Sequence, residues 1–314
     1  MKNELQLFQQ RVKDQSLILG ISLLLTGTMV GAEVPKVAVD TPPAHSLVAL
    51  VMGEVGTPAL ILPPGASPHG YAMRPSEVRV LNEAEIVFWV GKGLTPWLKR
   101  AIDTLASDSV VVELLAVDGL TLLDYRQSAT FATHKYENED PDHEDADPHV
   151  WLDPENAKVW LDAIAVTLSK ADPENTGVYF QNAATGKDEL DTLITELSEI
   201  LEPIHGKAFV VFHDAYQYFE ESFGIEASGA ISLGDASDPG PARLLKIQDT
   251  IEKFGVLCVF AEPLYKPKIV STVIEGTESR LGNLDSIGTY LEPGRFLYSR
   301  LLRNLAEGLV SCLK

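Results

Sequence analysis

Short apolar segments alternate with longer amphipathic segments along most of this 314-residue chain. Segments such as Ala59–Leu62, Glu85–Val90 and Val110–Leu114 have the length of strands, and helix-like stretches separate them. This alternation is typical of βα units, whose strands join a parallel sheet. Because a chain of this length exceeds what one core usually organises, we expect an α/β fold with two lobes.

One long helix-like segment divides this pattern into two halves. Residues 172–204 carry apolar residues at near-helical spacing with no proline in the interior, and Pro203 ends the segment. We therefore expect an N-terminal α/β lobe over residues 33–171, a linking long helix over 172–204 and a C-terminal α/β lobe over 205–314. In the second lobe the expected strands lie near residues 209–212, 256–260 and 280–284, and the expected helices begin at Tyr216, Pro267 and Tyr298.

The first 32 residues have the pattern of an export signal. Basic residues precede an apolar stretch over residues 16–30, and Val30-Gly-Ala32 offers the small residues that cleavage requires. The stretch is too short and too rich in Gly and Thr for a typical membrane span, although an uncleaved anchor is the alternative. We expect a signal peptide over residues 1–32 and export of the mature chain.

The net charge of the chain makes one class of binding partner improbable. A formal net charge of −20 argues against nucleic-acid binding, which needs a basic surface to displace phosphate counterions. The acidic balance is compatible with handling cations, although it also serves solubility alone.

The chain has only two cysteines, Cys258 and Cys312, and both lie late in the sequence. In an exported protein an even pair predicts a disulfide, which here would tie the last helix to a core strand. Closing a loop of about 54 residues would contribute roughly 4 kcal/mol on the chain-entropy model. Two buried free thiols are the alternative.

Residues 133–147 form a polar segment that breaks the βα pattern. It holds seven acidic residues between Glu137 and Asp147, together with His134 and His143. Such a composition cannot bury a core, so we expect a mobile loop. The segment is either a solvated charged loop or a place of weak, exchangeable metal capture.

Three histidines and one aspartate occupy comparable places in the pattern. His69 and His213 follow predicted strands, His149 precedes a helix start, and Asp285 closes a further strand. Ligands of open α/β sheets bind at the carboxyl ends of strands, and imidazole and carboxylate are natural ligands for zinc. These four residues predict a metal site in the cleft between the lobes. We expect His45, in a loop, and His205 to be surface residues or satisfied core residues.

Five segments carry a resemblance to a known family: Pro63–Val78, Asp147–Pro154, Val211–Phe219, Val259–Pro263 and Leu284–Gly288. In this order they resemble the motifs of the solute-binding proteins that supply metal ions to ABC importers, the metal-binding cluster A-I family. The stretch Phe212-His-Asp-Ala-Tyr-Gln-Tyr-Phe219 is most similar to the periplasmic zinc-binding members. The resemblance covers essentially the whole mature chain, including the acidic segment and the paired cysteines.

The resemblance implies that His69, His149 and His213 are three zinc-binding imidazoles. Manganese-binding relatives carry a carboxylate where His213 stands, and a nitrogen-rich ligand set suits zinc. Some zinc-binding relatives have an acidic residue immediately before the first histidine, but this chain has Pro68. The fourth ligand is therefore Asp285 or a water, and we favour Asp285.

The implied function is delivery of Zn²⁺ to an inner-membrane ABC permease by a monomeric periplasmic carrier that is not an enzyme. The long helix is expected to act as a stiff spine that allows small tilts. A zinc hydrolase with Glu262 as its general base is the main alternative, but the chain contains no HExxH or other hydrolase motif. A metal-dependent adhesin or a manganese carrier of the same fold is a further alternative.

Overall fold

The computed structural model describes residues 34–126, 128, 130–131, 146–232, 239–265 and 267–314. The predicted signal peptide and residues 133–145 of the predicted acidic loop lie outside the described residues. Among the helices of the described part, none is long and apolar enough to cross a membrane.

The N-terminal half contains a four-stranded parallel sheet with the order β2-β1-β3-β4. Its strands are β1 (Val37–Val39), β2 (Ala59–Leu60), β3 (Ile86–Trp89) and β4 (Val110–Glu113), and helices α2 (Pro42–Met52), α3 (Pro75–Glu83) and α4 (Pro96–Leu105) connect them. The central strands β1 and β3 are apolar and buried along their whole length, as expected for parallel strands covered by helices on both faces.

The C-terminal half repeats this architecture with a parallel sheet of order β6-β5-β7-β8. Its strands are β5 (Phe209–His213), β6 (Gly229–Ser232), β7 (Cys258–Ala261) and β8 (Arg280–Asn283), and its helices are α7 (Gln217–Phe223), α8 (Pro241–Phe254) and α9 (Pro267–Ile274). The predicted α/β fold with two parallel sheets is confirmed. Strand β6 was not expected, because its short Gly-Ala-Ile-Ser sequence gives no apolar run. Helix α8 was not expected either.

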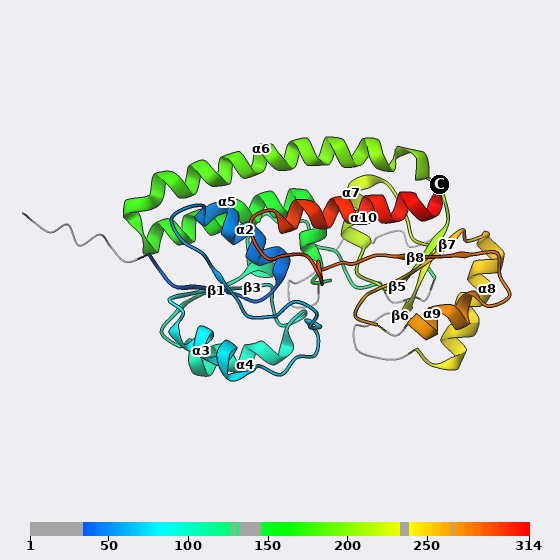
Figure 1. Cartoon of the computed structure of the whole chain (residues 1–314), viewed down its shortest axis with the longest axis horizontal. Helices are drawn as coiled ribbons and strands as arrows, with labels where there is room; N and C mark the ends of the chain where they lie inside the picture. The colour runs from blue at the N-terminus through cyan, green and yellow to red at the C-terminus, as the bar shows by residue number, and fades with distance from the viewer. Residues whose placement is uncertain (1–33, 127, 129, 132–145, 233–238, 266) are drawn as a thin grey trace, which may run out of the picture. The chain divides into compact units, whose positions relative to one another are not determined.

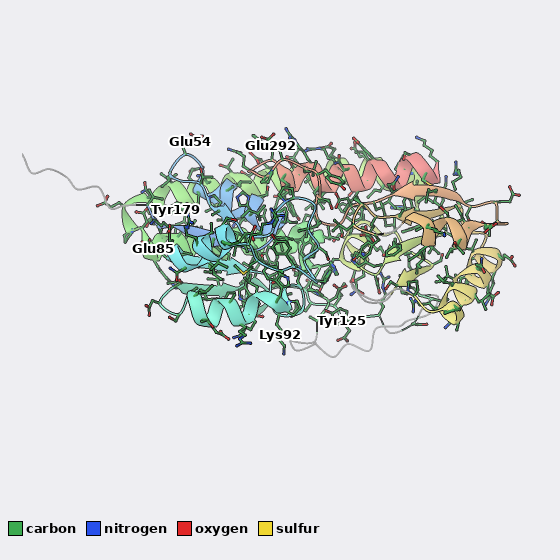
Figure 2. All side chains as sticks on the ribbon, turned by 60° about the horizontal axis from the view of Figure 1, so that its bottom comes forward. Glu54, Glu85, Lys92, Tyr125, Tyr179 and Glu292 are labelled. Atoms are coloured by element: carbon green, nitrogen blue, oxygen red, sulfur yellow. A yellow bond between two sulfur atoms is a disulfide. The ribbon has the colours of Figure 1, made fainter. Side chains whose placement is uncertain are left out.

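A helical layer runs along both sheets and contains the long helix (Figure 1). Helix α5 (Pro154–Ala171) and helix α6 (Thr176–Leu201) are joined by a short 3-10 turn over Pro173–Asn175. The long helix therefore begins later than residue 172, because Asp172 ends α5. The hydroxyl of Tyr179, a residue of α6 that is labelled in Figure 2, donates a 2.7 Å hydrogen bond to Asp172 Oδ2. A second 3-10 turn, Glu202–Ile204, follows α6.

Helix α6 lies close to two neighbouring helices at Gly186. A Cβ atom built on Gly186 would lie 2.7 Å from Leu50 Cδ2 and 3.0 Å from Leu161 Cδ1. A side chain at this position would press on the terminal methyl groups of Leu50 in α2 and Leu161 in α5, which would have to move, so glycine suits this close packing.

The C-terminal helix α10 (Leu297–Leu313) also joins the two halves, alongside α6 (Figure 1). It packs on α2 of the N-terminal half and on β8 of the C-terminal half, and Arg303 makes two 2.8 Å hydrogen bonds to Glu196 of α6. The largest hydrophobic core includes residues of both sheets, such as Phe88 and Phe260. Two helices and one continuous core therefore connect the lobes.

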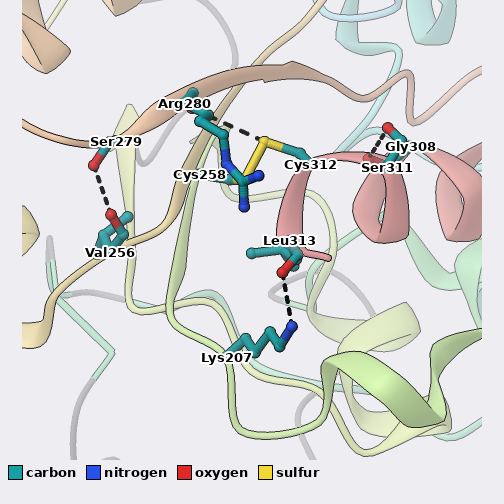
Figure 3. The surroundings of a disulfide bond; sticks show 9 residues. All are labelled: Lys207, Val256, Cys258, Ser279, Arg280, Gly308, Ser311, Cys312 and Leu313. Atoms are coloured by element: carbon teal, nitrogen blue, oxygen red, sulfur yellow. Dashed lines mark hydrogen bonds between the residues drawn. A yellow bond between two sulfur atoms is a disulfide. The ribbon is translucent and has the colours of Figure 1, made fainter.

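The predicted disulfide is present and joins Cys258 of β7 to Cys312 of α10 (Figure 3). The two α-carbons are 6.1 Å apart, which lies within the usual range for a disulfide. Next to it, the Lys207 ammonium donates a 2.9 Å hydrogen bond to the Leu313 carbonyl (Figure 3). The end of α10 is thus fixed to the C-terminal sheet by a covalent bond and a polar contact.

Candidate metal centre

The structure brings His69, His149 and His213 together from three distant segments. His69 lies in the loop between β2 and α3, His149 begins a 3-10 turn ahead of α5, and His213 is the last residue of β5. One ring nitrogen from each lies within 4.8 Å of the others, and the ring centroids are 5.3 to 6.2 Å apart. Since the Zn–N distance in proteins is about 2.0–2.1 Å, a small inward movement would let all three rings hold one ion.

A carboxylate orients each of the two buried histidines. His149 Nδ1 lies 2.7 Å from Asp147 Oδ1, and His213 Nδ1 lies 2.6 Å from Glu262 Oε1. Because an ionised carboxylate only accepts, Nδ1 of each neutral ring carries the proton, and Nε2 bears the lone pair that a metal needs. Carboxylates in this position are the common support of zinc-binding histidines.

A backbone group supports the third ring instead. His69 hydrogen-bonds to the backbone of Leu94, which belongs to the loop between β3 and α4. Asp40, at the end of β1, holds this loop at both ends: its Oδ2 accepts from Val90 N at 2.8 Å and from the Thr95 hydroxyl at 3.2 Å. The N-terminal sheet therefore determines where His69 is placed.

Electrostatics keeps the His69 ring neutral. Burial lowers its pKa, and the neighbouring His149 and His213 lower it further, to about 2, against the opposing effect of the Leu94 hydrogen bond. A neutral imidazole is the form that binds a metal ion. At neutral pH, therefore, no proton has to leave this ring before it can act as a ligand.

The cavity beside the histidines has a volume of about 10 Å³. This is about the space that one water molecule occupies by the same measure. Its other lining residues are half apolar, namely Pro68, Trp151, Pro263, Leu264 and Ile287, and half polar, namely Glu262, Tyr265, Asp285, Ser286 and Thr289. The cavity therefore has room for one ion.

Asp285 lines the same cavity, but it does not belong to the group of three close nitrogen ligands. Its Oδ1 accepts from Gly288 N at 2.9 Å and from the Thr289 hydroxyl at 3.0 Å, and its Oδ2 accepts from Thr289 N at 2.7 Å. Its own loop therefore holds this carboxylate in one orientation. Pro68 contributes no side-chain ligand, and its carbonyl accepts a 2.6 Å hydrogen bond from Trp97 Nε1.

The two histidines expected to be uninvolved lie apart from this group. His45 is buried in helix α2 rather than in the expected loop, and its Nε2 lies 3.0 Å from the Pro58 carbonyl. His205 Nε2 lies 3.0 Å from the Phe223 carbonyl. Each ring therefore has one nitrogen at hydrogen-bonding distance from a backbone oxygen, while Nδ1 of His45 is buried without a hydrogen-bond partner among the described residues.

Sequence reasoning missed the polar residues that surround the site. Asp147 was recognised only as part of a motif, although its position two residues before His149 lets its carboxylate reach that ring. It also missed Arg126, whose buried guanidinium pairs with Asp214, next to His213, and with Glu220 of α7. Burial raises the pKa of Asp214 to about 6, and Arg126 opposes the rise.

Comparison with known proteins places the chain in a family. Residues 37–312 match the family described as zinc-uptake complex component A, periplasmic, or ZnuA. The chain is 42% identical to the high-affinity zinc uptake system protein ZnuA of Paracoccus denitrificans, over 96% of this chain and 99% of that protein. It is 38% identical to ZnuA of Brucella abortus, over 91% of this chain and 94% of that protein. The solved laminin-binding protein Lbp of Streptococcus pyogenes is 25% identical with a TM-score of 0.71, over 89% of this chain and 99% of that chain. The chain therefore belongs to the ZnuA family of zinc-uptake components.

Proposed function

We propose that this protein is a periplasmic, high-affinity zinc-binding protein that captures Zn²⁺ and delivers it to an ABC importer. The observation that carries the proposal is the convergence of three imidazoles, two of them backed by buried carboxylates, beside a cavity with room for one ion. Membership of the ZnuA family supports zinc as the transported ion.

We assign His69, His149 and His213 as zinc ligands and Asp285 as the fourth, with a water as the alternative. Three neutral nitrogens and one oxygen form a set that suits Zn²⁺ better than Mn²⁺, which prefers oxygen-rich sites. The position of Asp285 at the cavity supports this assignment, and carboxylates that bind metals are themselves commonly hydrogen-bonded.

Family membership also supports the location and the partner. We propose that the export signal is removed near residue 32 and that the mature chain works as a monomer in the periplasm. Its partner would be the inner-membrane permease of a zinc ABC importer. Release would follow when the docked permease favours an arrangement of the lobes in which the ligands separate.

The alternative functions have less support. A zinc hydrolase needs a general base beside a zinc-bound water and space for a substrate, whereas Glu262 is hydrogen-bonded to His213 and the cavity is about 10 Å³. An adhesin of the same fold finds a parallel in the laminin-binding protein of Streptococcus pyogenes, at 25% identity. ZnuA of Paracoccus denitrificans, at 42% identity, is the stronger guide.

Metal titration of the purified, tag-free protein tests the proposal. After removal of bound metal, we expect one tightly bound zinc per chain, measured by competition with a chromophoric chelator and by elemental analysis. The variant His149→Ala should lose zinc affinity by more than the roughly 10- to 100-fold typical of supporting residues. Asp285→Asn should weaken zinc binding and reduce the preference for zinc over manganese.

The matched control is His205→Ala, which removes a histidine that lies outside the site. It should bind zinc like the wild type. A wild-type protein without a tight zinc site, or a His149→Ala variant with unchanged affinity, would contradict the proposal. An Asp285→Asn variant with unchanged affinity and selectivity would assign the fourth position to water.

A further inference from the structure

Gln217, the first residue of helix α7, links the two halves of the chain close to the metal centre. Its side chain is buried, with 2% exposure. Its Nε2 donates to the Asp124 carbonyl at 2.9 Å and to Asp147 Oδ2 at 2.6 Å. Both acceptors belong to the N-terminal half, whereas Gln217 belongs to the C-terminal half.

Asp147 is the carboxylate that orients His149. Its Oδ1 accepts from the His149 backbone N–H at 2.9 Å and lies 2.7 Å from His149 Nδ1, so Gln217 uses the other oxygen. The neighbouring Tyr218 hydroxyl donates to the Asp147 carbonyl at 2.9 Å. Helix α7 therefore holds both the side chain and the backbone of Asp147.

The same helix is joined to a second candidate ligand. His213 ends β5, and Gln217 begins α7 only four residues later. A short, buried path thus runs from His149 through Asp147 and Gln217 to the strand end that carries His213. The His69 ring does not belong to this path, because it is hydrogen-bonded to the backbone of Leu94 instead.

We propose that Gln217 is a positioning residue for metal binding, which fixes His149 relative to His213 by holding Asp147. The inference rests on the function proposed above and adds a residue to it. With this link, two ligands from opposite halves keep their spacing and tautomer before the ion arrives. Such preorganisation removes an ordering cost from binding and raises affinity.

The chemistry of an amide suits this role. Gln217 satisfies one Asp147 oxygen without adding a charge, so the negative charge of Asp147 continues to polarise the His149 ring. A lysine or arginine would neutralise that carboxylate and reduce the basicity of the imidazole. A leucine would leave a buried carboxylate oxygen without its donor, which is costly.

The experiment compares four single variants and one double variant of the full mature chain. Gln217→Leu and the near-isosteric Gln217→Met both remove the donor, and Asp147→Ala removes the acceptor. Ser222→Ala is the matched control, because the Ser222 hydroxyl donates from the same helix to Asp153 at 3.0 Å without touching Asp147. Zinc affinity is measured by chelator competition, and the His149 tautomer is measured by ¹⁵N NMR of the metal-free protein at pH 8.

Removal of the Gln217 donor should weaken zinc binding by about 10- to 100-fold and give the metal-free His149 ring a mixture of tautomers. Combining Gln217→Leu with Asp147→Ala should add little to Asp147→Ala alone, since Gln217 acts through Asp147. Ser222→Ala should leave both readouts unchanged.

The two readouts separate this inference from the proposed function. Unchanged zinc affinity and an unchanged His149 tautomer in both Gln217 variants would overturn the inference while zinc binding by the wild type stands. Fully additive losses in the double variant would also overturn it. If the wild type had no tight zinc site but the Gln217 variants still changed the His149 tautomer, zinc carriage would be rejected. The role of Gln217 in positioning His149 would be retained.

Discussion

Asp40 connects the interior of the N-terminal sheet to the metal centre. It is fully buried at the end of β1 and holds the loop on which His69 rests. Burial raises its pKa to about 6, and hydrogen bonds from Val90, Thr41 and Thr95 oppose the rise. An ionised Asp40 at neutral pH therefore lowers the stability of the fold while it organises the loop.

The pH dependence of stability should reveal this carboxyl group. A raised pKa means that the folded state binds the proton more tightly than the unfolded chain. The stabilisation of the folded state by protonated Asp40 is therefore complete below pH 3.8 and is lost as the pH rises through about 6. Within that window the wild type should gain up to about 1.4 kcal/mol of unfolding free energy per unit of acidification, relative to Asp40→Asn. Urea unfolding of both proteins between pH 4 and 7.5 measures the difference, and a constant difference would disprove the titration.

At the residue scale, the sequence predicts which histidines come together at the site. It predicts less well which carboxylates and backbone groups hydrogen-bond to those histidines. His69, His149 and His213 could be selected because each lies at the edge where parallel strands end. The pairing of Glu262 with His213 joins residues 49 positions apart, and local spacing does not encode such a contact. For the same reason Glu262 was considered only as a catalytic base.

Helix α10 and strand β7 depend on each other through the disulfide. Cys258 lies at the start of β7, at the opposite end from Glu262, so the bond is separated from the metal centre by the length of the strand. Replacing both cysteines by serine should lower the unfolding free energy by roughly 4 kcal/mol, because the loop of 54 residues is no longer closed in the unfolded chain.

Urea unfolding under oxidising conditions measures this loss, with reduced wild-type protein as the control. Zinc affinity should be the same in the variant and the wild type once both are folded. Equal unfolding midpoints for the oxidised wild type and the double variant would show that the bond contributes nothing to stability.

At the element scale, periodicity predicted the two sheets and the position of the long helix. It did not reveal β6, whose Gly-Ala-Ile-Ser sequence is too small and too short to stand out, and whose place is determined by pairing with β5. It also extended the long helix to residue 172, because helical periodicity continues through the 3-10 turn before α6.

For the whole molecule, the connections between the lobes limit their relative movement. Helices α6 and α10 and one hydrophobic core extend through both halves, and a packed core changes shape in small steps. We expect zinc binding to shift the lobes by roughly 1–2 Å rather than to close a wide hinge.

Spin labels on exposed helices of the two lobes test this expectation. Cysteines introduced at Asp103 of α4 and Glu252 of α8 leave the native disulfide and the ligands unchanged. Distances between the labels, measured by pulsed electron resonance with and without zinc, should have nearly the same mean. A displacement of several ångströms would contradict a shared, rigid core.

The order of the residues along the chain also determines when metal can be bound during folding. All three histidines precede residue 214, yet Glu262 and helix α10, which packs back onto α2, come from the last part of the chain. A chain that emerges with its N-terminus first would expose every imidazole before it could assemble the site, because an unfolded chain holds no preformed metal cage. Tight zinc capture would therefore wait for the final helix, and a zinc-loaded molecule would be one whose translocation and folding are complete.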